Sequence, residues 1–387
     1  MFKVKYRKFI NENINISILG FGCMRFPLYD SNDNGSINKE KSFEMLKYAF
    51  DSGINYFDTA YTYHDGQSEV FMGEAIKKLG RDKLYLATKM PLWLCKEYSD
   101  YENIFEEQLE KLQTKYIDFY LAHSLGENSY RKMVENNIFD FFDKERKSGR
   151  MKYVGFSFHD NLELFKEVVD SYSWDFCQIQ LNYMDENYQA GVEGLRYAKS
   201  KGLSVVVMEP VKGGFLANGP KEVKDYFKNL DKEYSMAQWA LKWVYNFNEV
   251  SLALSGMSNL DQVKENIEIA SKSEPNSLDL KELETINKVK EFFNSKTKIA
   301  CTACEYCLPC PEGVQIPSIF SKYNNAIIYD KKDRYKKEYI SLVEENKDAS
   351  LCVECRQCES ICPQSLNIID TLKEANDYFI GCVESFL

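Results

Sequence analysis

The sequence predicts an α/β protein that consists of a (β/α)₈ barrel followed by a small, mostly α-helical domain. Short apolar stretches alternate with charged, helix-like stretches along the first 300 residues. No G-x-G-x-x-G motif follows the first apolar stretch, which favours a closed barrel over an open doubly wound sheet. From about residue 297 the alternation stops and cysteines become frequent. A second domain of a different kind is therefore expected there.

Eight apolar stretches are the candidate strands of the barrel. Most are almost continuously apolar in the middle, as expected for parallel strands that are buried on both faces. They span residues 15–22, 54–60, 84–90, 117–124, 153–159, 176–182, 203–210 and 250–256. Eight strand–helix units in roughly 290 residues match the usual size of a (β/α)₈ barrel.

The stretches between the strands have helical features. In the first of them, Phe43, Leu46 and Phe50 recur near helical spacing. Glycines stand where several of these helices should end before the next strand, at positions 53, 80, 149 and 202. We therefore assign residues 1–296 to the barrel and residues 297–387 to the second domain.

Composition and charge limit the partners of the chain. The 387 residues carry a net charge of −10, whereas nucleic acids and anionic membranes require a basic surface. The sequence contains no apolar run long enough to span a bilayer and does not begin with a secretion signal. We therefore predict a cytoplasmic protein that binds neither nucleic acid nor a membrane.

Polar residues stand at the ends of three successive candidate strands. Asp58 lies near the end of the second strand, and Tyr63 follows it in the sequence. Lys89 lies near the end of the third strand and His123 near the end of the fourth. Because the carboxyl ends of barrel strands form one face, where active sites lie, these four residues are the candidate catalytic group.

The four residue types together suit proton transfer. A tyrosine hydroxyl has an ordinary pKa of about 10, which is too high for easy proton donation at neutral pH. A neighbouring lysine ammonium lowers that pKa, an aspartate keeps the lysine charged, and a neutral histidine can orient a carbonyl. Taken alone, Asp58 could simply cap a helix and His123 could be a hydrogen-bonded residue of the core. As a group they indicate protonation of an oxygen while a hydride reaches its carbon.

These stretches resemble the aldo-keto reductase family over roughly residues 10–295. "GINYFDTAYTYHDGQSE" is similar to the family's second strand, "LATKM" to its lysine strand and "IDFYLAHS" to its histidine strand. The resemblance implies that Tyr63 is the general acid/base and that Asp58, Lys89 and His123 complete the catalytic tetrad. It also implies a small carbonyl or alcohol substrate and a nicotinamide cofactor at the mouth of the barrel.

The resemblance also implies residues that bind the cofactor. These are Ser157 and Gln178 at the carboxamide, Met208 beside the nicotinamide ring, and Glu265 and Asn266 at the adenine. The sequence departs from the family in three places. Phe158 replaces a frequent asparagine, Met208 replaces a frequent aromatic residue, and Gly256 and Gln262 occupy positions that are often basic. The expected cofactor is therefore NADPH or NADH, without a choice between them.

Two cysteine runs dominate the last part of the chain. The first has the pattern C-x2-C-x2-C-x2-C-P and the second C-x2-C-x2-C-x3-C-P. The first run contains Cys301, Cys304, Cys307 and Cys310, and the second contains Cys352, Cys355, Cys358 and Cys362. The second pattern is typical of bacterial ferredoxins, whereas zinc sites usually have isolated C-x2-C pairs. The sequence thus favours two 4Fe–4S clusters, with zinc as the alternative.

The region resembles a dicluster ferredoxin module of helical type. In two-cluster ferredoxins the fourth cysteine of each run binds the other cluster. By this rule, one cluster takes Cys301, Cys304, Cys307 and Cys362, and the other takes Cys352, Cys355, Cys358 and Cys310. The first run is one residue shorter than usual before its fourth cysteine.

Together the two halves predict an NAD(P)-linked oxidoreductase with two 4Fe–4S clusters, which carry electrons to a redox partner protein or stabilise the fold. A hydride carries two electrons together, whereas a 4Fe–4S cluster passes one, and the barrel sequence offers no evident flavin site. The alternative is a non-enzymatic electron carrier in which the barrel is a docking scaffold.

Overall fold

The computed structural model describes residues 2–10, 14–31 and 33–381, which form two compact units. The first unit contains the described chain up to Pro210 and the segment Gln238–Leu278. The second contains Val211–Ala237 and the described chain from Asp279 onward. The boundary at residue 297 remains a sequence-based prediction, since in the structure the second unit also includes two earlier segments.

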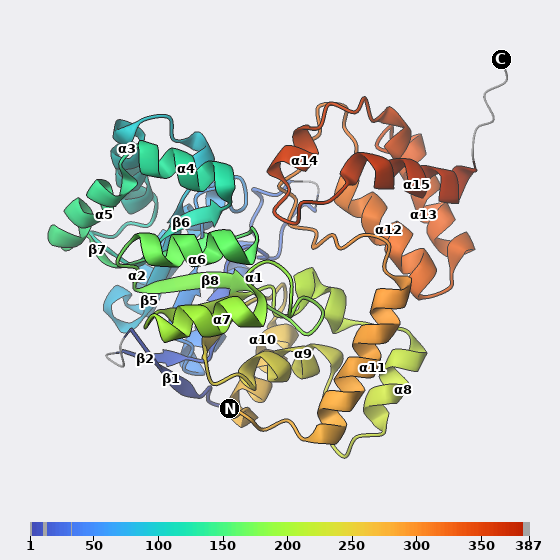
Figure 1. Ribbon diagram of the computed structural model, residues 1–387, viewed down its shortest axis with the longest axis horizontal. Helices are drawn as coiled ribbons and strands as arrows, with labels where there is room; N and C mark the ends of the chain where they lie inside the picture. The colour runs from blue at the N-terminus through green and yellow to red at the C-terminus, as the bar shows by residue number, and fades with distance from the viewer. Residues whose placement is uncertain (1, 11–13, 32, 382–387) are drawn as a thin grey trace. The chain divides into compact units, whose positions relative to one another are not determined.

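Eight parallel strands close into a barrel, in the order β10-β3-β4-β5-β6-β7-β8-β9 (Figure 1). The strands are β3 (Leu19–Gly22), β4 (Tyr56–Asp58), β5 (Tyr85–Met90), β6 (Ile117–Leu125), β7 (Met151–Phe158), β8 (Phe176–Gln180), β9 (Ser204–Met208) and β10 (Val250–Gly256). Nearly every residue in them is buried, which explains their continuous apolar character. The predicted (β/α)₈ barrel is confirmed.

The first candidate strand, residues 15–22, is corrected by the structure. Its first half belongs to β2 (Ile14–Ser17), which pairs antiparallel with β1 (Tyr6–Phe9) outside the barrel, and only its second half forms β3. The chain changes course between the two halves, where the Ser17 hydroxyl donates a hydrogen bond to the Leu19 carbonyl. Only Ile18 separates β2 from β3, so the two short strands resemble one strand in the sequence.

The hairpin of β1 and β2 closes one end of the barrel. Phe9, Ile14 and Ile16 are almost fully buried against side chains that point inward from the barrel strands, including Phe119 and Phe176. The Phe9 ring meets Phe119 edge-on at 5.3 Å between centroids. The barrel interior at this end is therefore a packed core.

Helices of the first unit cover the barrel. They are α1 (Lys39–Asp51), α2 (Gln67–Leu79), α3 (Tyr98–Lys111), α4 (Glu127–Glu135), α5 (Ile138–Lys147), α6 (Leu162–Ser171), α7 (Gly191–Ser200) and α10 (Leu260–Lys272), with α9 (Met236–Tyr245) at the edge of this unit. As predicted, Gly80 ends a helix: it follows α2 with a φ of 93°, which only glycine adopts easily.

The second unit is mostly helical, as predicted. Its helices are α8 (Lys221–Lys228), α11 (Leu280–Lys296), α12 (Ile316–Ile328), α13 (Lys332–Glu344), α14 (Gln357–Ile361) and α15 (Ile368–Ile380). Phe320, Tyr339 and Phe379 form its apolar core, and six of the eight clustered cysteines pack against that core. The cysteine loops thus rest on a folded support.

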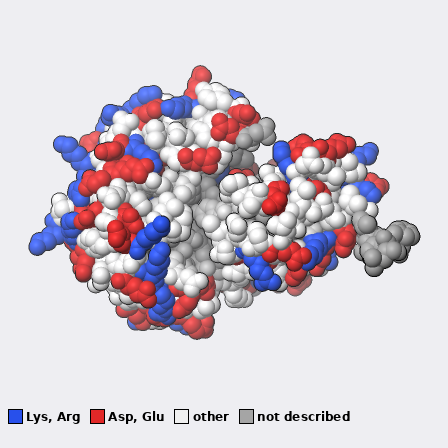
Figure 2. Space-filling model, turned by 90° about the horizontal axis from the view of Figure 1, so that it is seen from above, with Lys and Arg blue, Asp and Glu red and all other residues white. Residues whose placement is uncertain are grey.

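The outer surface of the chain mixes charges of both signs. On the face shown in Figure 2, Lys and Arg alternate with Asp and Glu over the described residues. Among the described residues, no helix combines the length and the apolar composition that crossing a bilayer requires.

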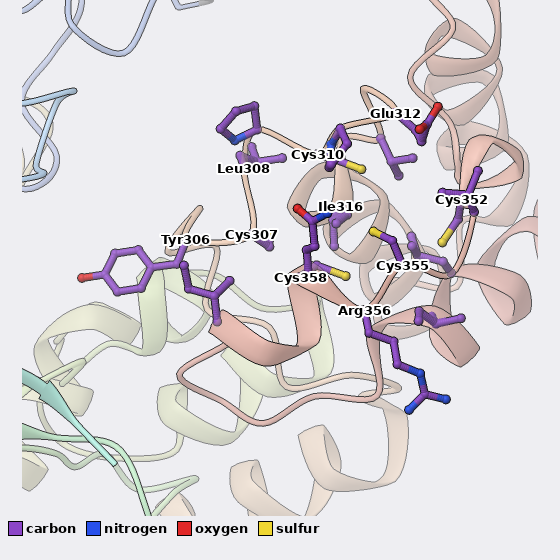
Figure 3. Close-up of a pocket in the computed structure, with 18 residues that line it drawn as sticks. Tyr306, Cys307, Leu308, Cys310, Glu312, Ile316, Cys352, Cys355, Arg356 and Cys358 are labelled. Atoms are coloured by element: carbon purple, nitrogen blue, oxygen red, sulfur yellow. The ribbon is translucent and has the colours of Figure 1, made fainter. Parts of the chain in front are cut away.

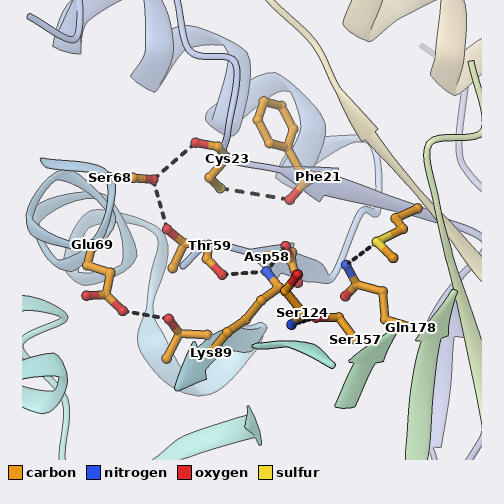
Figure 4. A network of polar contacts seen from close by, with 12 residues as sticks. Phe21, Cys23, Asp58, Thr59, Ser68, Glu69, Lys89, Ser124, Ser157 and Gln178 are labelled. Carbon is orange, nitrogen blue, oxygen red and sulfur yellow. Dashed lines mark hydrogen bonds and ion pairs between the residues drawn. The ribbon is translucent and has the colours of Figure 1, made fainter. Parts of the chain in front are cut away.

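A buried carboxyl group braces strand β5 from α2 (Figure 4). The Glu69 Oε1 atom accepts hydrogen bonds from the Thr88 hydroxyl at 2.5 Å and from the Gln108 amide at 2.7 Å. Gln108 also donates to the Lys89 carbonyl at 3.0 Å and accepts a bond from the Tyr120 hydroxyl. These contacts fix the strand that carries Lys89.

Replacing Glu69 by glutamine should change how stability depends on pH. Burial raises the pKa of Glu69 from 4.5 to about 7, against the opposing effect of hydrogen bonds from Thr88 and Gln108. Between these two values the folded chain keeps a proton that the unfolded chain has lost, so stability falls as pH rises through this window. Glu69→Gln should therefore be more stable than the wild type by up to about 3 kcal/mol at pH 8.

Urea unfolding at pH 8 and pH 5 measures this effect. At pH 5 the difference in unfolding free energy between Glu69→Gln and the wild type should fall below about 1 kcal/mol, because pH 5 lies only slightly above the unfolded pKa of Glu69. Glu74→Gln, on the exposed side of the same helix, is the matched control and should show no such change. An equal difference at both pH values for Glu69→Gln would contradict this interpretation.

Candidate functional site

Asp58 and Lys89 form a buried ion pair at the carboxyl ends of β4 and β5. The Lys89 Nζ atom lies 2.6 Å from Asp58 Oδ1 and also donates to the Thr59 carbonyl at 2.7 Å. Both side chains are almost fully buried, which fixes their geometry (Figure 4). Burial raises the pKa of Asp58, while the ammonium of Lys89 acts in the opposite direction. The structure thus brings together this half of the predicted tetrad.

Tyr63 and His123 lie next to this pair. Tyr63 is partly buried in the loop after β4, and its ring centre lies 5.0 Å from Lys89 Nζ. The rings of Tyr63 and His123 meet edge-on, with 6.2 Å between their centres. The four residues that the sequence singled out therefore gather at one end of the barrel.

His123 lies in surroundings that keep its ring neutral. Burial, the ammonium of Lys89 and the nearby His159 together hold the pKa of His123 well below its usual range. A neutral imidazole can donate one hydrogen bond and accept another. At neutral pH this ring can orient a polar group without adding charge to the site.

Ser157, Gln178 and Met208 lie on the neighbouring strands β7, β8 and β9. The Gln178 amide nitrogen lies 3.5 Å from the Met208 sulfur, and the Ser157 hydroxyl accepts a 2.7 Å bond from the Ser124 amide. The buried Gln178 Oε1 has no hydrogen-bond partner within the described part of the chain. A buried acceptor of this kind suits an N–H donor such as a carboxamide.

Glu265 and Asn266 lie on α10, on a different element from those three residues. Asn266 is buried and donates a 3.0 Å hydrogen bond to Ser255 at the end of β10. Glu265 is partly exposed beside it. The structure therefore holds Asn266 in place, but it does not test the predicted contact with adenine.

Sequence reasoning missed one neighbour of the site. Trp93 follows β5 and packs against the ring of His123, with 5.1 Å between the ring centres. Its indole is 42% exposed, so this aromatic surface is accessible from solvent. Trp93 is one of only four tryptophans, and its position just after a barrel strand was the available signal.

Five of the clustered cysteines line one pocket of about 190 Å³ in the second unit (Figure 3). They are Cys307, Cys310, Cys352, Cys355 and Cys358. Cys310 comes from the first run, yet it faces the first three cysteines of the second run. Cys307 of the first run lines the same pocket, so two cysteines of the first run lie with three of the second.

Cys362, the fourth cysteine of the second run, lies near Cys307 of the first run. Burial is the main cause that raises the pKa of Cys307 to about 12, and the thiols of Cys304, Cys301 and Cys362 add to the rise. Cys362, from the second run, therefore lies close enough to the first run to act on its charge. The Ala303 amide also donates a 3.4 Å hydrogen bond to the Cys301 sulfur.

The two runs have the same unusual backbone. Ala303 and Glu305 in the first run have positive φ angles of 52° and 65°. At the matching positions of the second run, Glu354 and Arg356 have φ angles of 58° and 61°. Each such residue costs on the order of 1–3 kcal/mol and is typical of ligand-binding loops, where turned N–H groups favour anions.

In the described residues, no three His, Cys, Asp or Glu side chains are arranged to hold a single metal ion. The four thiolates of a 4Fe–4S cluster bind four different iron atoms, so they lie farther apart than ligands of one zinc ion. Eight cysteines are the number of ligands that two such clusters require.

Comparison with known proteins supports the family resemblance of the barrel and that of the cysteine-rich region. The sequence model of the aldo/keto reductase family matches residues 18–290, and that of the 4Fe–4S dicluster domain matches residues 300–367. L-galactose dehydrogenase of Arabidopsis thaliana is 27% identical over 77% of this chain and 98% of its own length. NADH-specific methylglyoxal reductase of Escherichia coli is 24% identical over 60% of this chain and 84% of its own length.

Solved structures support the same fold. An aldo-keto reductase from Bacillus halodurans, in its holo form, is 26% identical, with a TM-score of 0.62 over 74% of this chain and 96% of that one. An aldo/keto reductase from Klebsiella pneumoniae, in complex with NADP and acetate, has a TM-score of 0.60 at 22% identity. The chain therefore belongs to the aldo/keto reductase family, as an oxidoreductase that also carries a 4Fe–4S dicluster domain.

Proposed function

We propose that the barrel interconverts a carbonyl and an alcohol with NADPH or NADH, with Tyr63 as the general acid/base. The observation that carries this proposal is the contact between the buried Lys89–Asp58 pair, the Tyr63 ring and His123. A proton donor, a fixed cation and a neutral hydrogen-bonding ring are the groups that carbonyl reduction requires around the reacting oxygen.

Tyr63 donates its hydroxyl proton to the substrate oxygen during reduction and recovers it during oxidation. The ammonium of Lys89 stabilises the phenolate that remains after donation. Asp58 holds that ammonium in position and balances its charge within the apolar barrel wall. His123 orients the substrate carbonyl toward Tyr63 by a hydrogen bond, and Trp93 packs against the ring of His123.

The nicotinamide, when bound, supplies or accepts the hydride. Ser157 and Gln178 hold its carboxamide, and the unpaired Gln178 Oε1 supports this assignment. Met208 would contact the nicotinamide ring through its polarisable sulfur. Glu265 and Asn266 bind the adenine end. Since positions 256 and 262 are not basic, the proposal covers both NADPH and NADH.

In the second unit the cysteines hold two 4Fe–4S clusters with crossed ligation. One cluster is bound by Cys301, Cys304, Cys307 and Cys362, and the other by Cys352, Cys355, Cys358 and Cys310. The pocket that Cys310 and Cys307 share with three cysteines of the second run, and the effect of Cys362 on Cys307, support ligation that crosses between the runs. The clusters, when bound, supply one-electron chemistry for exchange with a redox partner protein.

Replacing Tyr63 by phenylalanine should remove turnover but not cofactor binding. Without the hydroxyl no proton reaches the substrate oxygen, and general acid catalysis contributes about 10²–10⁴-fold. The printed names of two relatives suggest the probes: methylglyoxal with NAD(P)H, and L-galactose with NAD(P)⁺. These two probes lead a panel of small carbonyls and sugars, and turnover is followed by NAD(P)H absorbance.

Tyr61→Phe is the matched control, because Tyr61 lies two residues away and bonds to Glu107 instead. It should keep wild-type turnover. Cofactor binding by fluorescence titration should be the same in all three proteins. Unchanged turnover in Tyr63→Phe would contradict the role of Tyr63. Failure of the wild type to bind NAD(P)H would contradict the reductase proposal as a whole.

Paired cysteine substitutions test the crossed ligation. In Cys310→Ser/Cys355→Ser both changes fall on one proposed cluster, so the anaerobically purified protein should keep about four irons. In Cys310→Ser/Cys304→Ser the changes fall on different clusters, so most of the iron should be lost. Iron and sulfide analysis measures both proteins beside the wild type, which should hold about eight irons.

Ligation within each run predicts the reverse order. The first pair would then damage both clusters and the second pair only one. Zinc in place of iron in the wild type would contradict the cluster proposal itself. The far-ultraviolet circular dichroism of each variant shows whether the helical unit remains folded.

A further inference from the structure

A second cavity in the second unit, of about 720 Å³, is lined by none of the residues of the cysteine pocket. Its wall comes from residues 212–215 and 218–219 with Lys224, from Phe293 and residues 301–303, and from the region of α12 and α13. All these segments belong to the second unit. The volume lies within the range of roughly 300–1,000 Å³ that small-molecule sites span.

All the charged side chains that line this cavity are cationic. Its cationic side chains are Lys212, Lys224, Lys331 and Arg334, and none of the residues that line it is Asp or Glu. Lys212 is more than nine-tenths buried. Arg334 also pairs at 3.3 Å with the exposed Glu338, which lies outside the lining. In a chain with a net charge of −10, such a wall selects an anionic group, for which phosphate is well suited.

Aromatic rings make up another part of the wall. They are Phe215, Phe293, Tyr329 and Tyr335, and the first two are in contact, with 4.9 Å between their ring centres. Aromatic side chains bind flat conjugated ligands through stacked or edge-on contacts. The wall therefore suits a molecule that has both a ring system and a phosphate.

The cavity touches the segment that carries the first cysteine run. Cys301, Thr302 and Ala303 all line it. Gly213 packs directly against this segment, because a Cβ atom at that position would lie 2.1 Å from the Thr302 carbonyl oxygen. A ligand in the cavity would thus lie beside Cys301, one of the proposed cluster ligands.

We infer that this cavity binds a flavin mononucleotide, with its phosphate on the cationic side chains and its ring among the aromatic ones. The inference rests on the proposed function, in which hydride transfer moves two electrons and each cluster accepts one. A flavin that accepts a hydride from NAD(P)H becomes the anionic hydroquinone, which returns to oxidised flavin by releasing two electrons singly to two one-electron acceptors and one proton to solvent. The position beside Cys301 matches that role.

Equilibrium dialysis of the anaerobically purified holoprotein against flavin mononucleotide tests the site. The wild type should retain the flavin, and riboflavin, which lacks the phosphate, should bind at least about tenfold more weakly. Lys331→Glu/Arg334→Glu should weaken flavin mononucleotide binding by at least about tenfold, because it reverses two of the four cationic side chains that line the cavity. Lys336→Glu/Lys337→Glu makes the same charge change on the same helix outside the lining, and should bind as the wild type does.

Four results would overturn the inference: no retention at about 1 mM flavin, equal binding of riboflavin, unchanged binding in the cavity variant, or equal weakening in the control variant. A cavity variant that binds NAD(P)H more weakly but flavin normally would also overturn it, since the cavity would then belong to the dinucleotide. Carbonyl turnover and iron content are measured separately, so failure of this inference is distinguishable from failure of the proposed function.

Discussion

The buried contact between Lys89 and Asp58 is the interaction on which the rest of the site depends. Removing either partner would leave an uncompensated charge inside the barrel wall, at a cost of about 3–5 kcal/mol. The pair persists because the strand ends fix both side chains, and the network of Glu69, Thr88 and Gln108 fixes β5. The same ammonium faces the Tyr63 ring and lowers the pKa of His123.

Much of the barrel was predictable because its signals are local. Parallel strands buried on both faces are continuously apolar, and strand ends identify the catalytic face, so Asp58, Lys89 and His123 stand out in the sequence. The β1–β2 hairpin was missed because only Ile18 separates β2 from β3, so the two short strands resemble one strand in the sequence. Trp93 was missed as a site residue because its contact with His123 depends on a loop conformation that residue types do not reveal.

The cysteine module likewise has some features that the sequence predicts and others that it does not. The spacing of the runs indicates the kind of cluster, whereas the meeting of Cys307 and Cys310 with three cysteines of the second run in one pocket depends on the fold. The left-handed residues at matching positions of both runs were not predictable, because none of them is a glycine. Likewise, the cavity with cationic and aromatic side chains is formed by segments more than 100 residues apart, so no local sequence pattern predicts it.

Direct hydride transfer in the barrel is the central claim, and isotope tracing tests it most directly. NAD(P)H that carries deuterium at the transferable C4 position is incubated with the holoprotein and a small carbonyl, and the alcohol is analysed by mass spectrometry and NMR. The account predicts one deuterium on the carbinol carbon of each product molecule, with the hydroxyl proton drawn from solvent through Tyr63. Reduced product without deuterium at that carbon would show that electrons reach the carbonyl by another route and would contradict the account.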